Sequence, residues 1–181
     1  VNEREGLSST TVRQIILDDA GVPVATAAPV AISLDAGDRA TVEQSADIAA
    51  PRLWSPDHPA LYRVETVVMG GDGTRDTVRT TFGIRSIAFN AAWGFRLNGE
   101  TVKLKGVCNH HAAGPVGAAV PEGVLARRLR LLKAMGCNAI RTAHNPQAPE
   151  FYDLCDQLGL MVMDEAFDGW DVPKAEDDYG N

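Results

Sequence analysis

Three short runs of the sequence begin as apolar strands and end in side chains that can bind a ligand or carry charge. They cover residues 105–111, 141–146 and 162–170. The first ends in two histidines, the second carries an arginine and a histidine, and the third ends in acidic and aromatic groups. Imidazole both donates and accepts hydrogen bonds, and guanidinium is a permanent cation. These ends therefore either line a binding pocket or merely terminate the strands of a scaffold.

The segments between these runs have the apolar period of helices. Residues 123–135 place Leu125, Leu129 and Leu132 on one face, and residues 149–158 carry an apolar stripe of their own. The order strand, helix, strand, helix, strand predicts parallel pairing with right-handed crossovers. Because the carboxyl ends of parallel strands meet at one edge, the polar ends are expected on the active-site face of an incomplete (β/α) barrel.

The N-terminal half is typical of an all-β domain. Short strands separated by turns are expected at 12–17, 30–34, 40–44, 61–68 and 77–82. After residue 85 a hairpin of 94–97 with 101–104 is predicted on the turn Asn98-Gly99. The predicted fold is multidomain, β plus α/β. An immunoglobulin-like β-sandwich, without the cysteine pair of antibody domains, covers 1–85, and the first strands and helices of a barrel cover 86–181.

Composition excludes several classes of protein. The 181 residues are 45 % hydrophobic and 23 % charged, as in ordinary globular chains. The net charge of −7 argues against a nucleic-acid partner, and no apolar run is long enough to cross a membrane. A signal peptide, if the gene encodes one, is not in this chain. A soluble protein is expected, and its compartment, cytoplasmic or exported, is unknown from the sequence. The three cysteines are expected to be buried free thiols.

Several uncommon strings occur in a characteristic order. They are 53–59 (LWSPDHP), 82–85 (FGIR) and, most specifically, the stretch 95–170. With these strings the chain resembles glycoside hydrolase family 2, the group that contains β-galactosidases and β-glucuronidases. The resemblance implies a sugar-binding jelly roll, an immunoglobulin-like domain and a (β/α)8 TIM barrel, of which this chain covers the second and the opening third of the last. Residues 114–121 and 163–168 look more like bacterial β-galactosidases.

The resemblance also implies a reaction. Retaining glycosidases use two carboxyl groups about 5–5.5 Å apart, and in this family both are glutamates of later barrel strands, the acid/base typically following an asparagine. The sequence has one Asn-Glu pair, Asn2-Glu3, and it lies in the β-rich half. The catalytic pair is therefore expected beyond Asn181, in a retaining exo-β-glycosidase that cleaves terminal β-glycosides. A β-galactosidase-like specificity is favoured, β-glucuronidase-type specificity is the alternative, and this chain alone is expected to be inactive.

Three residues match substrate-pocket positions of the family. His110 and His144 match sugar-contacting histidines, and Arg141 matches an arginine beside the nucleophile, where a cation keeps a carboxylate ionised. For the histidines, the alternative is a structural role in which the ring hydrogen-bonds to the backbone. For Arg141, it is a salt bridge at the mouth of the barrel. His111 is expected to have a structural role.

The third run is acidic. Asp164, Glu165 and Asp168 could ligate a divalent cation, and in some relatives the position of Asp168 binds Mg²⁺ with a histidine two residues later, where this chain has Trp170. No metal or other cofactor is therefore assigned, and Mg²⁺ is the weaker alternative. Asp168 is kept as active-site support, Trp170 as a platform for sugar stacking or a core residue, and Asp164 and Glu165 are expected to pair with arginines.

Two other classes of function compete with this interpretation. One is a non-catalytic carbohydrate-binding or scaffold module, and the other is a metal-dependent hydrolase that uses the acidic run. In the favoured interpretation the partner is a carbohydrate substrate. Three barrel strands cannot close, so a second partner is expected to cover their open face. It is either the remainder of the same polypeptide or another copy of the chain.

Overall fold

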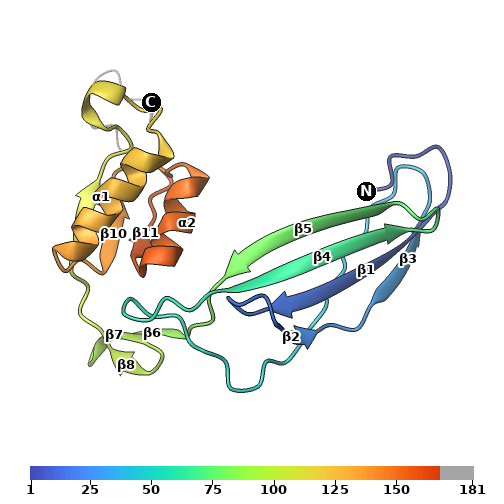
Figure 1. Ribbon diagram of the computed structural model, residues 1–181, viewed down its shortest axis with the longest axis horizontal. Coiled ribbons are helices and arrows are strands. Elements are labelled where there is room, and N and C mark those ends of the chain that lie inside the picture. The colour runs from blue at the N-terminus through green and yellow to red at the C-terminus, as the bar shows by residue number, and fades with distance from the viewer. Residues whose placement is uncertain (168–181) are drawn as a thin grey trace. The chain divides into compact units, whose positions relative to one another are not determined.

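The structure, a computed structural model, describes residues 1–167 of the chain (Figure 1). Asp168 and Trp170, two of the predicted site residues, lie outside this range. The chain divides into two compact units. The sheet unit comprises Val1–Leu53 and Ala60–Ile84, and the α/β unit comprises Trp54–Pro59 and the residues from Arg85 onward. Within residues 1–167, no helix has both the length and the apolar character needed to span a membrane.

The sheet unit is built on one long antiparallel sheet. Its strands are β1 (Ser8–Leu17), β2 (Pro23–Thr26), β3 (Val30–Leu34), β4 (Tyr62–Gly70) and β5 (Arg75–Phe82). The order is β2-β1-β4-β5, with β3 also paired to β1. Tyr62 and Val67 of β4 are buried, and they lie on opposite faces of the strand because they are an odd number of residues apart. The β4–β5 turn is closed by Asp72, whose carboxylate accepts hydrogen bonds from the Thr74 amide at 3.0 Å and the Thr74 hydroxyl at 2.6 Å.

One expectation about the strands was wrong, and one strand was missed. Residues 40–44 form no strand; instead the Gln44 side chain donates hydrogen bonds to the carbonyls of Ala28 at 2.5 Å and Val12 at 3.4 Å. The edge of β1 that a strand there could have used is taken by β2 and β3. The short strand β2 was not predicted, because four residues with a leading proline carry little strand signal.

A small three-stranded sheet opens the α/β unit. It consists of β6 (Ile87–Asn90), β7 (Gly94–Leu97) and β8 (Glu100–Thr101), in the order β6-β7-β8. The predicted turn between β7 and β8 is confirmed, with φ of 52° at Asn98 and 84° at Gly99. Both values suit the left-handed turn that Asn-Gly favours. The second strand is shorter than predicted, and β6 was missed because a run of four residues carries little strand signal. All four residues of β6 are exposed.

The barrel elements follow the predicted order. The strands β9 (Gly106–Asn109), β10 (Ala139–Thr142) and β11 (Met161–Met163) form a parallel sheet in the order β11-β10-β9. Between them lie a short 3₁₀ turn (Gly114–Val116), α1 (Glu122–Ala134) and α2 (Pro149–Leu158). The two helices lie side by side against the sheet (Figure 1). Their apolar faces and the sheet share one core of Leu125, Ala126, Leu129, Cys137, Ile140, Phe151, Leu154, Cys155 and Leu160.

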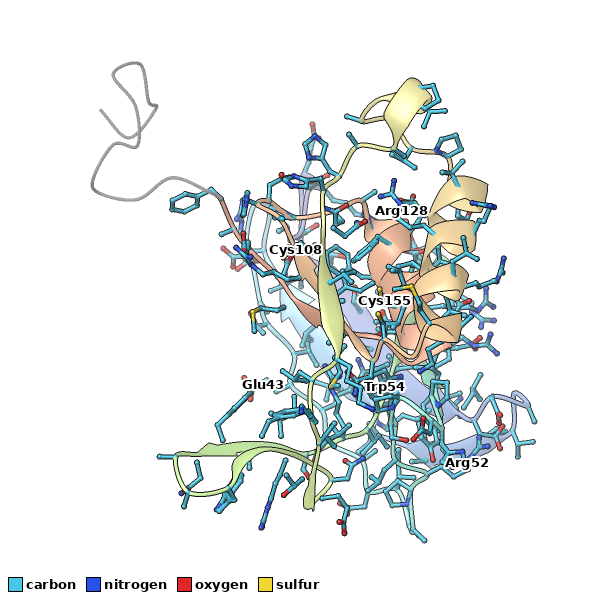
Figure 2. All side chains as sticks on the ribbon, turned by 90° about the vertical axis from the view of Figure 1, so that its left-hand side faces the viewer. Glu43, Arg52, Trp54, Cys108, Arg128 and Cys155 are labelled. Carbon is cyan, nitrogen blue, oxygen red and sulfur yellow. The ribbon has the colours of Figure 1, made fainter. Side chains whose placement is uncertain are left out.

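The segment 54–59 belongs to the α/β unit, and its first residue, Trp54, lies at the end of the unit away from Arg128 (Figure 2). Trp54 is 2 % exposed, and its indole N–H donates to the Asp156 carbonyl at 2.8 Å. The Lys133 ammonium donates to the carbonyls of Pro56 at 2.7 Å and Gly159 at 2.9 Å. Gly159 caps α2 with a φ of 71°, the left-handed conformation common after a helix. The segment therefore holds the carboxyl end of α2 through backbone carbonyls.

Candidate active site

Strand register decides which side chains reach the candidate site. Arg141 of β10 lies opposite Cys108 of β9 and Met163 of β11, while Ile140 pairs with Val107 and Val162. Ile140 is in the core beneath the helices, with Val107 and Val162 packed against it. Because successive side chains of a strand point to opposite faces, the row that contains Arg141 lies on the face away from the helices, which is the interior side of a barrel.

Glu165 joins two of the predicted site residues. One carboxylate oxygen, Oε1, accepts a short hydrogen bond from Nε of Arg141, and the other, Oε2, lies 2.7 Å from Nδ1 of His144. Nη1 of Arg141 also donates to the Cys108 sulfur at 3.3 Å. The side chains of Arg141 and His144 are 43 % and 40 % exposed, against 22 % for Glu165. The cation and the imidazole can therefore meet a ligand, while the carboxylate lies deeper and anchors both.

The charges of this group reinforce each other. The hydrogen bond with His144 is the main cause that lowers the pKa of Glu165 below its ordinary value of 4.5, and Arg141 lowers it further while desolvation opposes both. In turn, the hydrogen bond to Glu165 raises the pKa of Arg141 above its ordinary value. Glu165 is therefore ionised at neutral pH, and its charge is lost only as pH falls through a range below 4.5.

Asp164 lies on the other face of the sheet and contacts no arginine among residues 1–167. Its Oδ1 accepts hydrogen bonds from the hydroxyls of Thr142 and Tyr152, both at 2.8 Å. The Thr142 hydroxyl also accepts from the backbone N–H of Glu165 at 2.8 Å, and Thr142 is fully buried. Pairing with arginine was therefore predicted correctly for Glu165 and wrongly for Asp164. Strand alternation accounts for the difference, since adjacent residues face opposite sides.

His110 comes from the end of β9 and meets His144 edge-on. The two ring centroids are 5.6 Å apart with an interplanar angle of 88°. The peptide bond before His144 is cis. The structure thus brings His110, Arg141 and His144 together at the carboxyl ends of β9 and β10, with Glu165 from the end of β11. Their contact with a substrate stays a prediction.

Arg128 of α1 holds the chain that carries His110, and sequence reasoning missed it. Its guanidinium donates three hydrogen bonds: to Oδ1 of Asn109 at 3.0 Å, to the His110 carbonyl at 3.3 Å and to the Ala112 carbonyl at 3.1 Å. Arg128 extends from the helix toward the end of β9 (Figure 2). Helical spacing showed only that Arg128 lies off the buried leucine face. A local sequence pattern cannot predict which acceptors on another element a guanidinium will bind.

Replacing Arg128 with alanine is expected to loosen residues 109–117 without unfolding the helix. Three hydrogen bonds to charged guanidinium are lost, so amide hydrogen exchange in this segment is expected to accelerate at least about tenfold. Exchange followed by mass spectrometry checks this. Arg127→Ala is the matched control, because Arg127 is the adjacent exposed residue of the same helix. Equal exchange in both variants would show that Arg128 does not hold the loop.

The cysteines divide into two environments. Cys137 and Cys155 are buried free thiols, as predicted, and burial raises the pKa of Cys155 to about 12. Cys108 is exposed, which the prediction had wrong, because its position in β9 faces away from the helices (Figure 2). Among residues 1–167, no three His, Cys, Asp or Glu side chains are grouped to hold a metal ion. The Mg²⁺ alternative depends on Asp168 and stays untested.

Sequence comparison places both halves of the chain in one family. Residues 1–85 match "Glycosyl hydrolases family 2", and residues 92–173 match "Glycosyl hydrolases family 2, TIM barrel domain". The β-galactosidase BoGH2A of Bacteroides ovatus is 42 % identical over 179 residues, which are 99 % of this chain and 21 % of that protein.

Solved structures agree with the sequence relatives. A β-glycosidase from Bacteroides vulgatus superposes with a TM-score of 0.83 at 41 % identity, over 99 % of this chain and 22 % of that one. A β-glucuronidase from Bacteroides uniformis gives a TM-score of 0.85 at 31 % identity, over 96 % and 21 %. The chain thus spans about a fifth of the length of these relatives. It belongs to glycosyl hydrolase family 2, and its predicted fold class is confirmed: the family's β-sandwich domain followed by the start of its TIM barrel.

Proposed function

We propose that this chain is part of a retaining exo-β-glycosidase and supplies one wall of its sugar pocket. The observation that carries the proposal is the convergence of His110, Arg141 and His144 at one sheet edge of a family 2 barrel. Two imidazoles and a guanidinium, each partly or fully exposed, offer donors and acceptors to sugar hydroxyls. A binding module would instead present its polar and aromatic groups on the β-sandwich.

The catalytic glutamates belong to a later part of the polypeptide in this proposal. Glu165 is the only glutamate at a barrel-strand end within residues 1–167, and both of its oxygens are engaged by Arg141 and His144. A carboxylate anchored in this way is poorly placed to attack a sugar or to donate a proton to a leaving group. The 181-residue chain by itself is therefore expected to be inactive.

The open face of the sheet also supports the proposal that the rest of the barrel lies in a later part of the polypeptide. A cavity of about 480 Å³ lies on the interior side of β9, β10 and β11, and apolar side chains such as Phe95, Leu104 and Met161 line it. Met163 is 58 % exposed there. The proposed cover is the rest of the barrel, and self-association is the alternative. The proposal includes the predicted domain boundary, with the β-sandwich domain ending at residue 85 and the barrel beginning at residue 86.

The relatives carry two names, so the test includes two sugars. A protein that contains this chain and the remainder of its barrel is expected to hydrolyse 4-nitrophenyl β-galactoside, with the β-glucuronide as the alternative, and to release the β-anomer first. His144→Ala is expected to lower kcat/KM about 100-fold, because a hydrogen bond to the sugar is lost. His111→Ala is the control on a neighbouring exposed histidine. Unchanged turnover in His144→Ala would remove this residue from the pocket, and inert wild-type protein would contradict the proposed function.

A further inference from the structure

The Nδ1 atom of His144 has two neighbours that make opposite demands. Glu165 Oε2 lies at 2.7 Å and Arg141 Nη2 at 3.4 Å. An ionised carboxylate only accepts hydrogen bonds, and a guanidinium only donates them. A neutral imidazole nitrogen cannot satisfy both, since it is either protonated or not. The contact with Glu165 is much shorter and is charge-assisted, so it determines the proton position. In the neutral ring, Nδ1 carries the hydrogen and Nε2 carries a lone pair.

The carboxylate that makes this choice is itself held in place. Its Oε1 is occupied by Arg141 Nε, which leaves Oε2 for the imidazole. The backbone N–H of Glu165 donates to the hydroxyl of Thr142, which is fully buried. Each carboxylate oxygen therefore has its own partner, and rotation of the carboxylate would break both contacts. A group fixed at both ends in this way is suited to orient a neighbouring ring.

The exposed part of His144 is then an acceptor. Glu165 and Arg141 both lie at the Nδ1 side of the ring, and 40 % of the His144 side chain is exposed. Among residues 1–167, Nε2 has no hydrogen-bond partner and is not one of the buried unpaired atoms. We propose that Glu165 is a positioning residue which holds His144 in the Nδ1–H tautomer, so that Nε2 accepts a hydrogen bond from a sugar hydroxyl. This inference rests on the proposed function and adds the polarity of one contact: the hydroxyl that faces His144 must be the donor.

A substitution of Glu165 by glutamine is expected to reverse that polarity. Arg141 Nε requires an acceptor, so the amide oxygen of the new side chain is expected to take the place of Oε1. The amide NH₂ group then faces Nδ1 of His144 and donates to it. Nδ1 becomes the acceptor, and the proton of the neutral ring moves to Nε2. One change of atom type at residue 165 therefore converts the ligand-facing nitrogen from acceptor to donor.

The test measures inhibition constants with the full-length protein. The inhibitors are the methyl 1-thio-β-glycoside of the sugar that the protein cleaves and its analogues in which one hydroxyl of the ring, other than the 2-hydroxyl, is replaced by hydrogen or by fluorine. Fluorine cannot donate a hydrogen bond but can accept one weakly. The hydroxyl that faces His144 is identified with the His144→Ala variant. Replacing that hydroxyl weakens binding to wild-type protein but does not weaken binding to His144→Ala.

At that hydroxyl, the deoxy and fluoro analogues are expected to bind wild-type protein equally poorly, each about tenfold weaker than the parent. In Glu165→Gln the fluoro analogue is expected to bind several-fold better than the deoxy analogue. Asp164→Asn is the matched control: it changes the adjacent carboxylate, which faces Thr142 and Tyr152, and is expected to leave the ratio of the two analogues unchanged.

Three outcomes would overturn the inference. The first is a wild-type protein that binds the fluoro analogue clearly better than the deoxy analogue, because Nε2 would then be a donor. The second is a correctly folded Glu165→Gln variant with the wild-type ratio. The third is a His144→Ala variant in which replacing any of the hydroxyls still weakens inhibitor binding as it does in wild-type protein. Hydrolysis by wild-type protein is measured in the same preparation, so a failed polarity test with normal turnover leaves the proposed function standing.

Discussion

Replacing Arg141 with alanine is expected to lower kcat/KM of the full-length protein about 1000-fold, the largest kinetic effect among the residues of this chain. Removing one preorganised charged donor from an active site costs about 3–4 kcal/mol of transition-state stabilisation. Arg141 also contributes the contact that fixes Oε1 of Glu165, and it donates to Cys108 at 3.3 Å. In the proposed pocket the same guanidinium keeps the nucleophilic carboxylate ionised. Steady-state hydrolysis of the 4-nitrophenyl glycoside checks the result.

Two further variants separate charge from geometry at this position. Arg141→Lys keeps the charge but lacks the planar guanidinium group that reaches Glu165 and Cys108 together. Its kcat/KM is therefore expected to exceed that of Arg141→Ala by less than tenfold. Arg130→Ala removes an exposed arginine of α1 and controls for the loss of one positive charge. If Arg141→Ala loses less than tenfold in kcat/KM while its melting temperature drops, Arg141 is a structural salt-bridge partner and not a pocket residue.

Replacing Gly159 with alanine is expected to destabilise the α/β unit by about 3 kcal/mol or more. Gly159 has a φ of 71°, which costs an L-residue about 1 kcal/mol or more. A Cβ atom built there would lie 2.2 Å from the Pro56 carbonyl oxygen, which also accepts a hydrogen bond from Lys133. That oxygen belongs to the backbone, so segment 54–59 or the end of α2 must move. A movement of this kind disturbs the contact between Trp54 and Asp156.

A matched substitution isolates this effect. Gly123 lies in α1, a Cβ atom there would meet nothing within 4 Å, and its φ is not in the left-handed region. Gly123→Ala is therefore expected to be neutral or to stabilise the protein by up to about 1 kcal/mol. Thermal unfolding of the two variants, followed by circular dichroism, measures the difference. If the melting temperature of Gly159→Ala equals that of wild-type or Gly123→Ala protein, the end of α2 accommodates the extra methyl group without strain.

Local pattern was sufficient for the elements of the barrel. Residues 149–158 were predicted as a helix and form α2, and 123–135 differs from α1 by one residue at each end. An apolar stripe of period 3.6, bounded by glycine, specifies such a helix almost independently of its surroundings. Strands in the β-rich half were less predictable. Residues 40–44 have strand propensity, but both edges of β1, to which the Gln44 side chain bonds, are occupied by β2 and β3 on one side and β4 on the other. In the α/β unit, β6 was missed because a run of four residues carries little strand signal.

The sequence by itself determined the family, the order of the barrel elements and the three residues that meet at the sheet edge. Motif spacing and strand alternation suffice for these, since both are properties of consecutive residues. Only the tertiary structure decided that Glu165 joins Arg141 to His144, that Asp164 bonds to Thr142 and Tyr152, and that Arg128 holds the loop of His110. Such partners come together across 12 to 24 residues of chain through strand register and the rotation of a helix against its sheet. No local pattern encodes either quantity.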